Sequence, residues 1–453
     1  MISAFEQYFT SLKNKKIAVL GLGVSNRPLV RLLLEFGCDV VGCDRTPREK
    51  LDAEVLELES LGCKLHVGDD YLEGVEADIL FRTPGMHPGN PAIEALRSRG
   101  AEVTSEMEVF FEVCPCHLLA VTGSDGKTTT TTLVSEMLKA AGKTVWLGGN
   151  IGTPLLPLVR EMKPDDFAVV ELSSFQLMDM KRSPERAIVT NLAPNHLDVH
   201  KDMEEYVESK KNIFRYQDEK GLLILNADNA ITAAFKGNGE TRLFSRKGTA
   251  YVCMEGDTIC RGGEPVLKTA DILIPGVHNI ENYMAAIAMV EGLVDDETIR
   301  HVAKNFGGVE HRIELVRIKD GVRFYNDSIA SSPSRTIAGL RSFPEKVILI
   351  AGGYDKHIPY DVLGPEICAH VKKLFLGGAT GKLIREAVEA YPEYDPAVLE
   401  IVDCETFEPA VRAAAAAARD GDIVLMSPAS AAFDQFKNFM VRGEFYKKLV
   451  KEL

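Results

Sequence analysis

A glycine-rich turn between a predicted strand and a predicted helix constrains the fold of this chain more than any other feature. The strand is the apolar run at 118–121, and the turn reads Thr-Gly-Ser-Asp-Gly-Lys-Thr-Thr-Thr over 122–130. Gly142 stands where the helix should end, and the apolar positions at helical spacing before it are Leu133, Val134, Met137, Leu138 and Ala141. A buried strand that leads through such a turn into a helix is typical of parallel α/β layers. We therefore predict an α/β protein.

The composition of this turn predicts a nucleoside triphosphate site. Glycine lets backbone N–H groups close around phosphate oxygens, and the dipole at the start of a helix favours an anion. The side chains add a positive charge from lysine and a hydroxyl for Mg²⁺ from threonine. The predicted phosphate-binding residues are Gly123, Ser124, Asp125, Gly126, Lys127, Thr128 and Thr129. The usual first glycine is replaced by Val121, and a purely structural turn is the disfavoured alternative.

Length and charge narrow the class of protein. A chain of 453 residues has room for about three domains of about 150 residues each. The net charge of −14 argues against nucleic acid and anionic membranes as partners, because both attract basic proteins. The sequence has neither an apolar N-terminal segment nor an apolar run of about 18 residues, so we expect a cytoplasmic protein without membrane spans.

The nine cysteines are expected to be reduced thiols, because a long chain of this class needs no disulfide framework. Cys114, Cys116 and His117 could in principle bind a metal ion. No second ligand pair follows them at zinc spacing, so the thiol interpretation is preferred.

The first hundred residues have the pattern of a nucleotide-binding βαβ unit. A strand at 16–20 ends in Gly-Leu-Gly-Val-Ser-Asn, a helix is expected next, and a second strand at 40–43 ends at Asp44. An acidic residue at this distance is placed to meet a ribose or a base. Asn26 stands where a third glycine is usual, which weakens a dinucleotide interpretation and leaves a structural turn as the alternative. Another predicted strand breaks at the Pro-Gly pair 84–85, and it is expected to form a wall of the crevice in which the nucleotide would bind.

Candidate metal ligands follow the glycine-rich turn. Glu171 ends a predicted strand at 168–170, where a carboxylate beside a phosphate loop would suit Mg²⁺; an ion pair or a helix cap is the alternative. The loop at 195–200 contains His196, for which capping of the next helix and a chemical role are both open.

Lys210 lies on the apolar face of the helix after that loop, together with Tyr206, Val207, Ile213 and Phe214. A lysine placed in this way either extends to solvent or is desolvated with a lowered pKa. A neutral amine can take up CO₂, and the resulting carbamate would offer oxygen to a second Mg²⁺. The spacing leaves both possibilities open.

The rest of the chain is expected to contain a small β portion and a second open sheet. Short strands are predicted over 240–275, the last of them at 272–275. Asn279 and Asn282 open a helix and could read an adenine edge; capping is the alternative for Asn279. Three later strands each end in a Gly- or Ser-rich loop before a helix, at 347–351, 374–376 and 423–426.

These patterns predict three domains. The first is a Rossmann-like domain over 1–105. The second, over 106–308, is a central phosphate-loop ATPase domain with a parallel sheet and the small β portion. The third is a Rossmann-like open sheet over 309–453.

A series of short motifs from one end of the chain to the other resembles the Mur ligase family, whose members form amide bonds with ATP in peptidoglycan precursor synthesis. The motifs are GLGVSN, TGSDGKTTT, GGNIG, ELSSFQL, NHLD, YVESK, HNIEN, EHRIE, NDS, GGYDK and SPASAAFDQFKNF. Two of them, ELSSFQL and the last, are similar to the members that add D-glutamate.

The resemblance implies a reaction and its cofactors. The carboxylate of UDP-N-acetylmuramoyl-L-alanine would attack the γ-phosphate of ATP, and the D-glutamate amine would displace phosphate from the acyl phosphate. The glycine-rich turn would hold ATP. Two Mg²⁺ ions are implied, one on Thr128 and Glu171 and the other on His196 and a carbamylated Lys210. We expect a monomer.

The resemblance also implies the remaining site residues. The residues assigned to ATP outside the turn are Asn279 and Asn282 for adenine, Asp327 for the ribose and Arg312 near the γ-phosphate. The residues assigned to the UDP substrate are Val24, Ser25, Asp44 and Gly85, with Asn150 nearby. Lys356 is assigned to a D-glutamate carboxylate, and the other predicted substrate contacts are Ser331, Phe433 and Phe439. The predicted catalytic set is Lys127, His196, Lys210, Arg312 and Lys356.

The chain departs from the family pattern at two positions near the substrates. Ile329 stands where the family often has lysine, and Ala432 stands where it has serine. Ser331 or backbone amides could substitute for the missing groups.

Three other functions stay open on the sequence. One is a sister ligase that adds a different amino acid, the second is a dehydrogenase built on the N-terminal glycine turn, and the third is a nucleotide-binding regulator without turnover.

Overall fold

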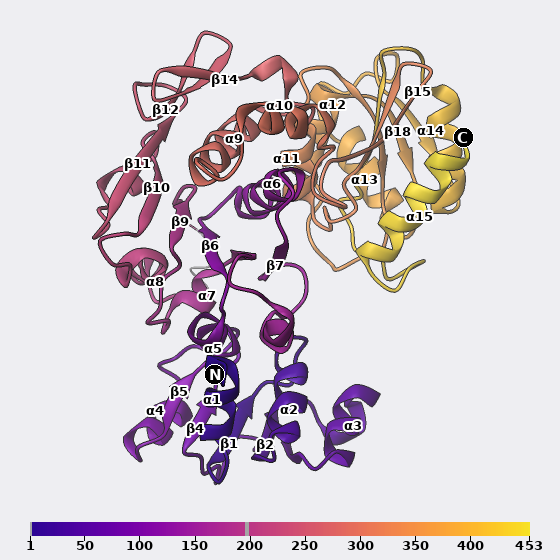
Figure 1. Cartoon of the computed structure of the whole chain (residues 1–453). Helices are drawn as coiled ribbons and strands as arrows, with labels where there is room; N and C mark the ends of the chain where they lie inside the picture. The colour runs from indigo at the N-terminus through magenta and orange to yellow at the C-terminus, as the bar shows by residue number, and fades with distance from the viewer. Residues whose placement is uncertain (1, 195–198) are drawn as a thin grey trace. The chain divides into compact units, whose positions relative to one another are not determined.

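The computed structural model describes residues 2–194 and 199–453. The chain divides into two compact units: residues 1–269 with 281–302 form the first, and residues 270–280 with 303–453 form the second. Three separate sheets confirm the predicted α/β class, two of them in the first unit and one in the second (Figure 1). The domain boundaries near 105 and 308 stay predictions.

The N-terminal sheet is parallel throughout, with the order β3-β2-β1-β4-β5 among the described residues. Its strands are β1 (Lys16–Leu20), β2 (Asp39–Asp44), β3 (Lys64–Val67), β4 (Ile79–Phe81) and β5 (Glu102–Thr104). The helices around it are α1 (Ala4–Ser11), α2 (Asn26–Glu35), α3 (Ala53–Ser60) and α4 (Pro91–Ser98). The βαβ unit predicted from the sequence is confirmed, because β1 pairs in parallel with both β2 and β4.

The central sheet has the order β14-β13-β12-β11-β10-β9-β6-β8-β7 in the described part of the chain. Its parallel strands are β6 (His117–Thr122), β7 (Val145–Gly149), β8 (Phe167–Glu171), β9 (Arg186–Val189), β10 (Leu222–Asn226), β11 (Glu240–Ser245) and β12 (Val252–Glu255). Two antiparallel strands extend it, β13 (Thr258–Arg261) and β14 (Glu264–Lys268). The helices of this region are α5 (Glu106–Val113), α6 (Lys127–Ala140), α7 (Ser174–Leu177), α8 (Met203–Arg215), α9 (Val277–Met289) and α10 (Asp296–Asn305).

The predicted strand at 272–275 is wrong. The β portion ends at β14, and this segment forms no ladder; the N–H of Leu273 instead donates one hydrogen bond to the carbonyl of Ala303. Pro275 has no N–H to continue a ladder. An apolar run of four residues therefore did not distinguish a strand from a partly buried irregular connection.

The sheet of the second unit has the order β15-β16-β20-β17-β18-β19 among the described residues. Only β15 runs antiparallel to its neighbour. The strands are β15 (Glu314–Lys319), β16 (Val322–Asn326), β17 (Val347–Ala351), β18 (Val371–Leu376), β19 (Glu400–Asp403) and β20 (Ile423–Met426). The helices are α11 (Pro333–Leu340), α12 (Leu363–His370), α13 (Gly381–Glu389), α14 (Phe407–Ala417) and α15 (Phe439–Glu452). Strand β20 lies between β16 and β17 and runs parallel to both, so the carboxyl ends of these three strands lie at the same edge of the sheet.

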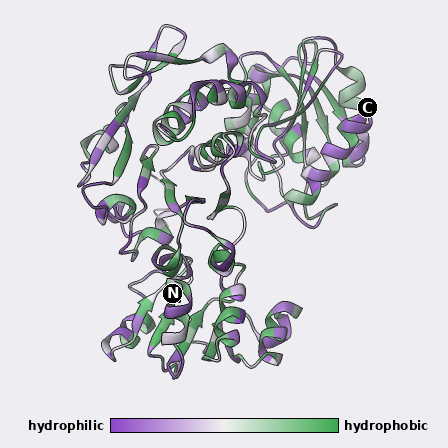
Figure 2. Cartoon of the chain, in the orientation of Figure 1, coloured by the Kyte–Doolittle hydropathy of each residue, from purple (hydrophilic) through white to green (hydrophobic). Residues whose placement is uncertain are grey.

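Hydrophobic strands build the cores of both units, as the green strands in Figure 2 show. In the first unit one continuous core joins the N-terminal and central sheets: it contains Phe5 and Phe9 of α1, Phe110 of α5 and Tyr206 of α8. Arg160 lies over the ring of Phe5 at 5.3 Å. Shared burial of this kind explains why the first two sheets form one unit.

Among the described residues, none of the helices combines the length and the hydrophobicity needed to span a bilayer.

Candidate active site

The glycine-rich turn leaves β6 and enters α6 as predicted. Gly126 immediately precedes α6 with a φ of 78°, and Gly123 has a φ of 149°. The turn is held from outside by hydrogen bonds from the N–H of Ser124 to Asn191 O (2.9 Å) and from the N–H of Asp125 to Asn191 Oδ1 (3.0 Å). Lys127 Nζ donates to Gly123 O at 3.0 Å and to Ser124 O at 2.9 Å. The loop is thus preorganised, and its lysine lies against it.

The two glycines are required where they stand. A Cβ atom at Gly123 would lie 1.9 Å from Thr190 Oγ1, and one at Gly126 would lie 2.4 Å from Asn282 Oδ1. Asn282 Oδ1 also accepts a hydrogen bond from Thr130 Oγ1 at 3.2 Å. Asn282, predicted to contact adenine, is therefore positioned directly beside the phosphate loop.

We expect Gly126→Ala to raise the KM for ATP by about tenfold, because a residue with a Cβ loses on the order of 1–2 kcal/mol in the left-handed conformation and must also displace Asn282. Gly142→Ala is the matched control: Gly142 follows the same helix with a φ of 76°, and no atom lies within 4 Å of its added Cβ. Steady-state kinetics with varied ATP compares the two. Equal KM values in both variants would contradict the prediction.

Glu171 ends β8 next to the phosphate loop with its carboxylate buried. Its side chain is 1% exposed, and Oε1 accepts a hydrogen bond from Asn150 Nδ2 at 2.8 Å. Oε2 is buried and has no hydrogen-bond partner among the described residues. A buried carboxylate oxygen without a partner is unfavourable unless a cation binds it. The donor fits Mg²⁺, which prefers hard oxygen ligands. Asn150, predicted near the UDP substrate, here orients this carboxylate.

Lys210 does not extend to solvent. It is 2% exposed, and Nζ donates to Thr122 Oγ1 at 3.1 Å and to Gly123 O at 2.9 Å. Burial is the main cause that holds the pKa of this amine well below its usual range; the nearby charge of Lys127 acts in the same direction and that of Glu171 in the opposite one. The environment therefore favours the neutral, nucleophilic amine.

Tyr206, which was not predicted as a site residue, connects α8 to the phosphate loop. Tyr206 OH lies 2.8 Å from Ser124 Oγ, and its ring lies 5.0 Å from Lys210 Nζ. The His200 ring lies edge-on to Tyr206 at 5.2 Å and its Nε2 is 2.9 Å from Ser174 Oγ. The sequence contained one signal for the contact between Tyr206 and Lys210: Tyr206 lies four residues before Lys210, so both lie on the same face of the helix. The predicted ligand His196 lies outside the described residues.

The residues predicted for the UDP substrate in the N-terminal sheet lie in the loops that follow β1, β2 and β4 or at the ends of these strands. Asp44 accepts hydrogen bonds from the N–H of Leu22 (2.8 Å) and of Thr46 (2.9 Å). Although burial opposes the effect, these N–H groups lower the pKa of the carboxyl. Asn26 Nδ2 donates to Leu20 O and Gly21 O, so it closes the turn at the place of the third glycine. The other residues predicted for the UDP substrate at this edge are Val24, 75% exposed, Ser25, half-buried, and Gly85, exposed.

Arg82, which immediately follows β4, links the N-terminal sheet to α7 and was not anticipated from the sequence. It is 2% exposed; its NH1 donates to Met86 O at 2.7 Å and its NH2 to Phe175 O at 3.1 Å. The loop that carries Gly85 is thereby tied to α7, the helix that follows Glu171 in the chain.

The second unit carries the remaining predicted residues. Arg312 lies between two residues in the left-handed region, His311 (φ 63°) and Ile313 (φ 44°). Asp327 immediately follows β16, is 3% exposed, and accepts hydrogen bonds from Ser427 Oγ (2.7 Å) and Ile313 N (3.3 Å). Burial raises the pKa of Asp327 to about 7 despite these bonds. Asp327 therefore has an internal structural role beside its predicted one.

The other predicted contacts of this unit are spread over loops and helix starts. Asn279 Nδ2 donates to Pro275 O at 2.5 Å. Ser331 Oγ donates to Ile329 O at 3.3 Å. Phe433 is 60% exposed, and its ring lies 5.8 Å from that of Tyr354. The remaining ones are Lys356, in the loop after β17, and Phe439, whose ring lies 6.1 Å from that of His311.

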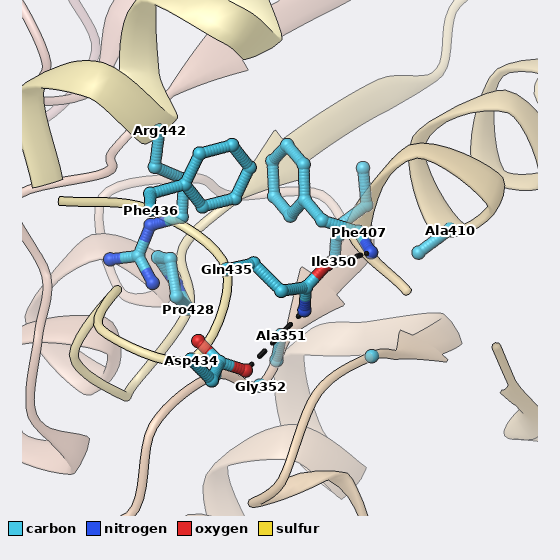
Figure 3. Close-up of a pocket in the computed structure, with 12 residues that line it drawn as sticks. Ile350, Ala351, Gly352, Phe407, Ala410, Pro428, Asp434, Gln435, Phe436 and Arg442 are labelled. Atoms are coloured by element: carbon cyan, nitrogen blue, oxygen red, sulfur yellow. Dashed lines mark hydrogen bonds between the residues drawn. The ribbon is translucent and has the colours of Figure 1, made fainter. Parts of the chain in front are cut away.

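A small pocket lies beside the ends of β17 and β20 (Figure 3). Gln435 crosses it, accepting from Phe407 N at 3.0 Å and donating to Asp434 Oδ2 at 3.3 Å, as the dashed lines in Figure 3 mark. Arg442, 1% exposed, donates to Ser328 O (2.9 Å) and Ala431 O (3.1 Å). Its buried charge ties the loop after β16 to the loop after β20.

Comparison with known proteins identifies the family. Residues 121–290 match the model of the Mur ligase middle domain, and residues 311–430 match that of the Mur ligase glutamate ligase domain. Relatives named UDP-N-acetylmuramoylalanine–D-glutamate ligase are 51% identical in Acetivibrio thermocellus and 47% identical in Clostridium botulinum strain Hall, each over 100% of both chains.

Solved structures agree in fold. UDP-N-acetylmuramate-alanine ligase from Thermotoga maritima has a TM-score of 0.59 at 18% identity, covering 97% of this chain and 100% of that one. UDP-N-acetylmuramoyl-L-alanyl-D-glutamate–2,6-diaminopimelate ligase has a TM-score of 0.60 at 16% identity, covering 97% and 93%. These two likenesses concern the fold alone. On the family models and the full-length relatives together, the chain belongs to the Mur ligase family.

Proposed function

We propose that this protein is an ATP-dependent ligase that joins D-glutamate to UDP-N-acetylmuramoyl-L-alanine in peptidoglycan precursor synthesis. The observation that carries the proposal is the likeness, over the whole of both chains, to relatives named for this reaction. The phosphate loop with buried Glu171 and Lys210 beside it supports the ATP-dependent step. We also propose that the protein acts as a cytoplasmic monomer.

The reaction has two steps. The alanyl carboxylate attacks the γ-phosphorus of ATP, the bond between that phosphorus and the β,γ-bridging oxygen breaks, and ADP leaves with the electron pair. The neutral amine of D-glutamate then attacks the acyl carbonyl carbon, the C–O bond to phosphate breaks, and inorganic phosphate leaves while the amine loses a proton. Both steps bring negative groups together, so they depend on electrostatic stabilisation.

The chain's own residues would orient the phosphates. The N–H groups of Ser124 and Asp125 are bonded to Asn191, so the donors proposed for phosphate are those at the start of α6, where Lys127 also carries a positive charge. Arg312 and Lys356 supply the cations proposed for the γ-phosphate and for a D-glutamate carboxylate. Asn279, Asn282 and Asp327 are proposed for the adenosine part.

Four residues are proposed to hold two Mg²⁺ ions: Thr128, Glu171, His196 and Lys210 as its carbamate. When bound, Mg²⁺ supplies charge neutralisation between the attacking carboxylate and the phosphates. The buried Oε2 of Glu171 fits this role because it has no hydrogen-bond partner among the described residues. Lys210 fits carbamate formation because burial lowers the pKa of its amine, which favours the neutral form; uptake of CO₂ by that form releases one proton and creates a carboxylate.

An amino-acid panel tests the proposal. We expect phosphate release from ATP to require both UDP-N-acetylmuramoyl-L-alanine and D-glutamate, and to fall to background when D-glutamate is replaced by L-alanine, L-lysine or meso-diaminopimelate. Equal release with another amino acid would assign the chain to a sister activity. Binding of NADH would favour the dehydrogenase alternative, and nucleotide binding without release would favour a regulator.

A further inference from the structure

The two neighbours of Arg312 adopt backbone conformations that residues with a Cβ rarely take. His311 has a φ of 63° and Ile313 a φ of 44°, and the branched Cβ of Ile313 makes this conformation especially unfavourable. Arg312, the exposed residue between them, closes a tight turn: its N–H donates to Val309 O at 2.9 Å. Strain of this kind persists only where surrounding contacts enforce it, and it is concentrated at functional sites. The contacts around this turn must therefore hold it in place.

Polar side chains at the start of β15 and the end of β16 bond to the turn. The N–H of His311 donates to Glu314 Oε2 at 2.9 Å, and the N–H of Ile313 donates to Asp327 Oδ1 at 3.3 Å. Asn326 Nδ2 lies 3.0 Å from His311 Nδ1 and donates to Glu314 Oε2 at 3.0 Å. Both strained residues thus have their N–H groups bonded to carboxylates.

One face of α15 also contacts the turn. Phe439, Gly443 and Lys447 are spaced four residues apart, so they lie on the same face of the helix. The ring of His311, which is 6% exposed, lies 6.1 Å from that of Phe439. It also lies directly against Gly443, because a Cβ atom there would be only 2.2 Å from His311 Nδ1. A side chain at position 443 would therefore displace the His311 ring.

Lys447 is the charged member of this helix face. Its Nζ lies 2.5 Å from Glu310 Oε1 and 3.2 Å from Glu314 Oε1, and these two residues stand immediately before and after the segment 311–313. A third carboxylate, that of Glu444, lies 3.1 Å away. Although burial opposes the effect, these carboxylates raise the pKa of Lys447, so the amine stays charged. One cation thus joins both ends of the turn to α15.

We propose that Gly443 and Lys447 are positioning residues of the ligation reaction: together they keep the turn at 310–314 in its strained conformation and thereby fix the direction of the Arg312 guanidinium. The inference rests on the proposed function, in which Arg312 acts near the γ-phosphate, and adds to it the helix face that orients this cation. A charge that is preorganised for the transition state loses much of its effect when the backbone that carries it relaxes.

The test uses the full-length enzyme with ATP, Mg²⁺, UDP-N-acetylmuramoyl-L-alanine and D-glutamate at saturation. We expect Lys447→Met to lower the turnover number about tenfold, because methionine keeps the apolar stem but leaves the carboxylates at both ends of the turn without their cation. Lys447→Arg, which keeps the charge, should retain most of the turnover. The matched control is Lys448→Met: Lys448 is the next residue of α15, pairs with Glu452 at 3.9 Å and is 70% exposed.

Gly443→Ala tests the same helix face without changing a charge. Alanine is favoured over glycine in a helix interior, so the substitution by itself should not weaken α15. The added Cβ would displace the His311 ring, and we expect the turnover number to fall about tenfold. Gly381→Ala at the start of α13 is the control, since the atom nearest to its added Cβ is Leu376 Cβ at 3.5 Å, an ordinary contact.

Combination with Arg312→Ala separates positioning from general stabilisation. If Lys447 and Gly443 act through Arg312, then Lys447→Met and Gly443→Ala cause no further loss of turnover once Arg312 has been replaced. Phosphate release in a single turnover, with the enzyme in excess over the UDP substrate, measures the residual rate. Equal fold losses in the presence and absence of Arg312 would overturn the inference, because they would assign both residues to the stability of the unit.

The outcomes distinguish this inference from the proposed function. A wild-type enzyme that releases no phosphate with its substrates refutes the function itself. Full turnover in Arg312→Ala refutes the role of Arg312 and the inference with it. If the wild type is active and Arg312→Ala impairs it, wild-type rates in Lys447→Met and Gly443→Ala refute the positioning role alone.

Discussion

Replacing Lys210 by alanine is expected to lower the turnover number about a thousandfold. The reason is the position of the amine: Nζ is buried within hydrogen-bond distance of Gly123 O in the phosphate loop, and Glu171 lies close enough for its charge to act on it. If Lys210 carries the carbamate, the variant loses both a metal ligand and a negative charge. The KM for ATP should change much less, since the loop itself stays intact. Phosphate release under saturating substrates measures the effect.

Lys211→Ala is the matched control, because Lys211 is the next residue of α8 but pairs with Glu208 at 2.6 Å on the outer side. It should keep near-wild-type turnover. Formate or acetate added to Lys210→Ala is expected to restore part of the activity, since a small carboxylate can occupy the emptied position. Full activity in Lys210→Ala without any additive would end the carbamate hypothesis. If the thermal midpoint fell in Lys210→Ala but not in Lys211→Ala, the loss of activity would be assigned to reduced stability.

The sequence was sufficient to predict the parts of the site that follow from local pattern. Strand, glycine turn and helix are consecutive in the chain, so the phosphate loop at 122–130 appeared where it was expected. The position of Lys210 on the apolar face of α8 followed from the sequence, whereas its burial was one of two outcomes that the spacing left open. Glu171 was expected next to the loop because it ends a predicted strand. It lies there because β8 is the parallel neighbour of β6, the strand from which the loop leaves.

Contacts between distant segments could not be predicted in the same way. The bond of Arg82 to Phe175 joins residues 93 positions apart, and no periodicity encodes it. Asn26 at the third glycine position was ambiguous in sequence, because its role depends on two carbonyls that only the folded turn brings together. The strand predicted at 272–275 was wrong for a related reason. An apolar run indicates burial but does not show whether a neighbouring strand is available to pair with it.

Replacing Glu171 by glutamine is expected to lower turnover about a hundredfold and to raise the Mg²⁺ concentration needed for half-maximal activity. Glutamine keeps the shape of the side chain and can still accept the hydrogen bond from Asn150 through Oε1. What it loses is the negative oxygen, Oε2, which has no partner among the described residues and is therefore the atom available to a cation. A Mg²⁺ titration of phosphate release in the variant and the wild type makes the comparison.

Asp166→Asn provides the matched control for this experiment. Asp166 immediately precedes the same strand at its opposite end, is buried, and has its carboxylate engaged by Trp146 Nε1 at 2.9 Å and Lys163 N at 3.0 Å. Its loss should lower stability and leave the Mg²⁺ requirement unchanged, because no oxygen there is reserved for a cation. If Glu171→Gln changed the thermal midpoint but not the Mg²⁺ requirement, Glu171 would be a structural carboxylate. If both variants shifted the Mg²⁺ requirement equally, the effect would arise from the general loss of a negative charge, and the metal site would have to be sought elsewhere.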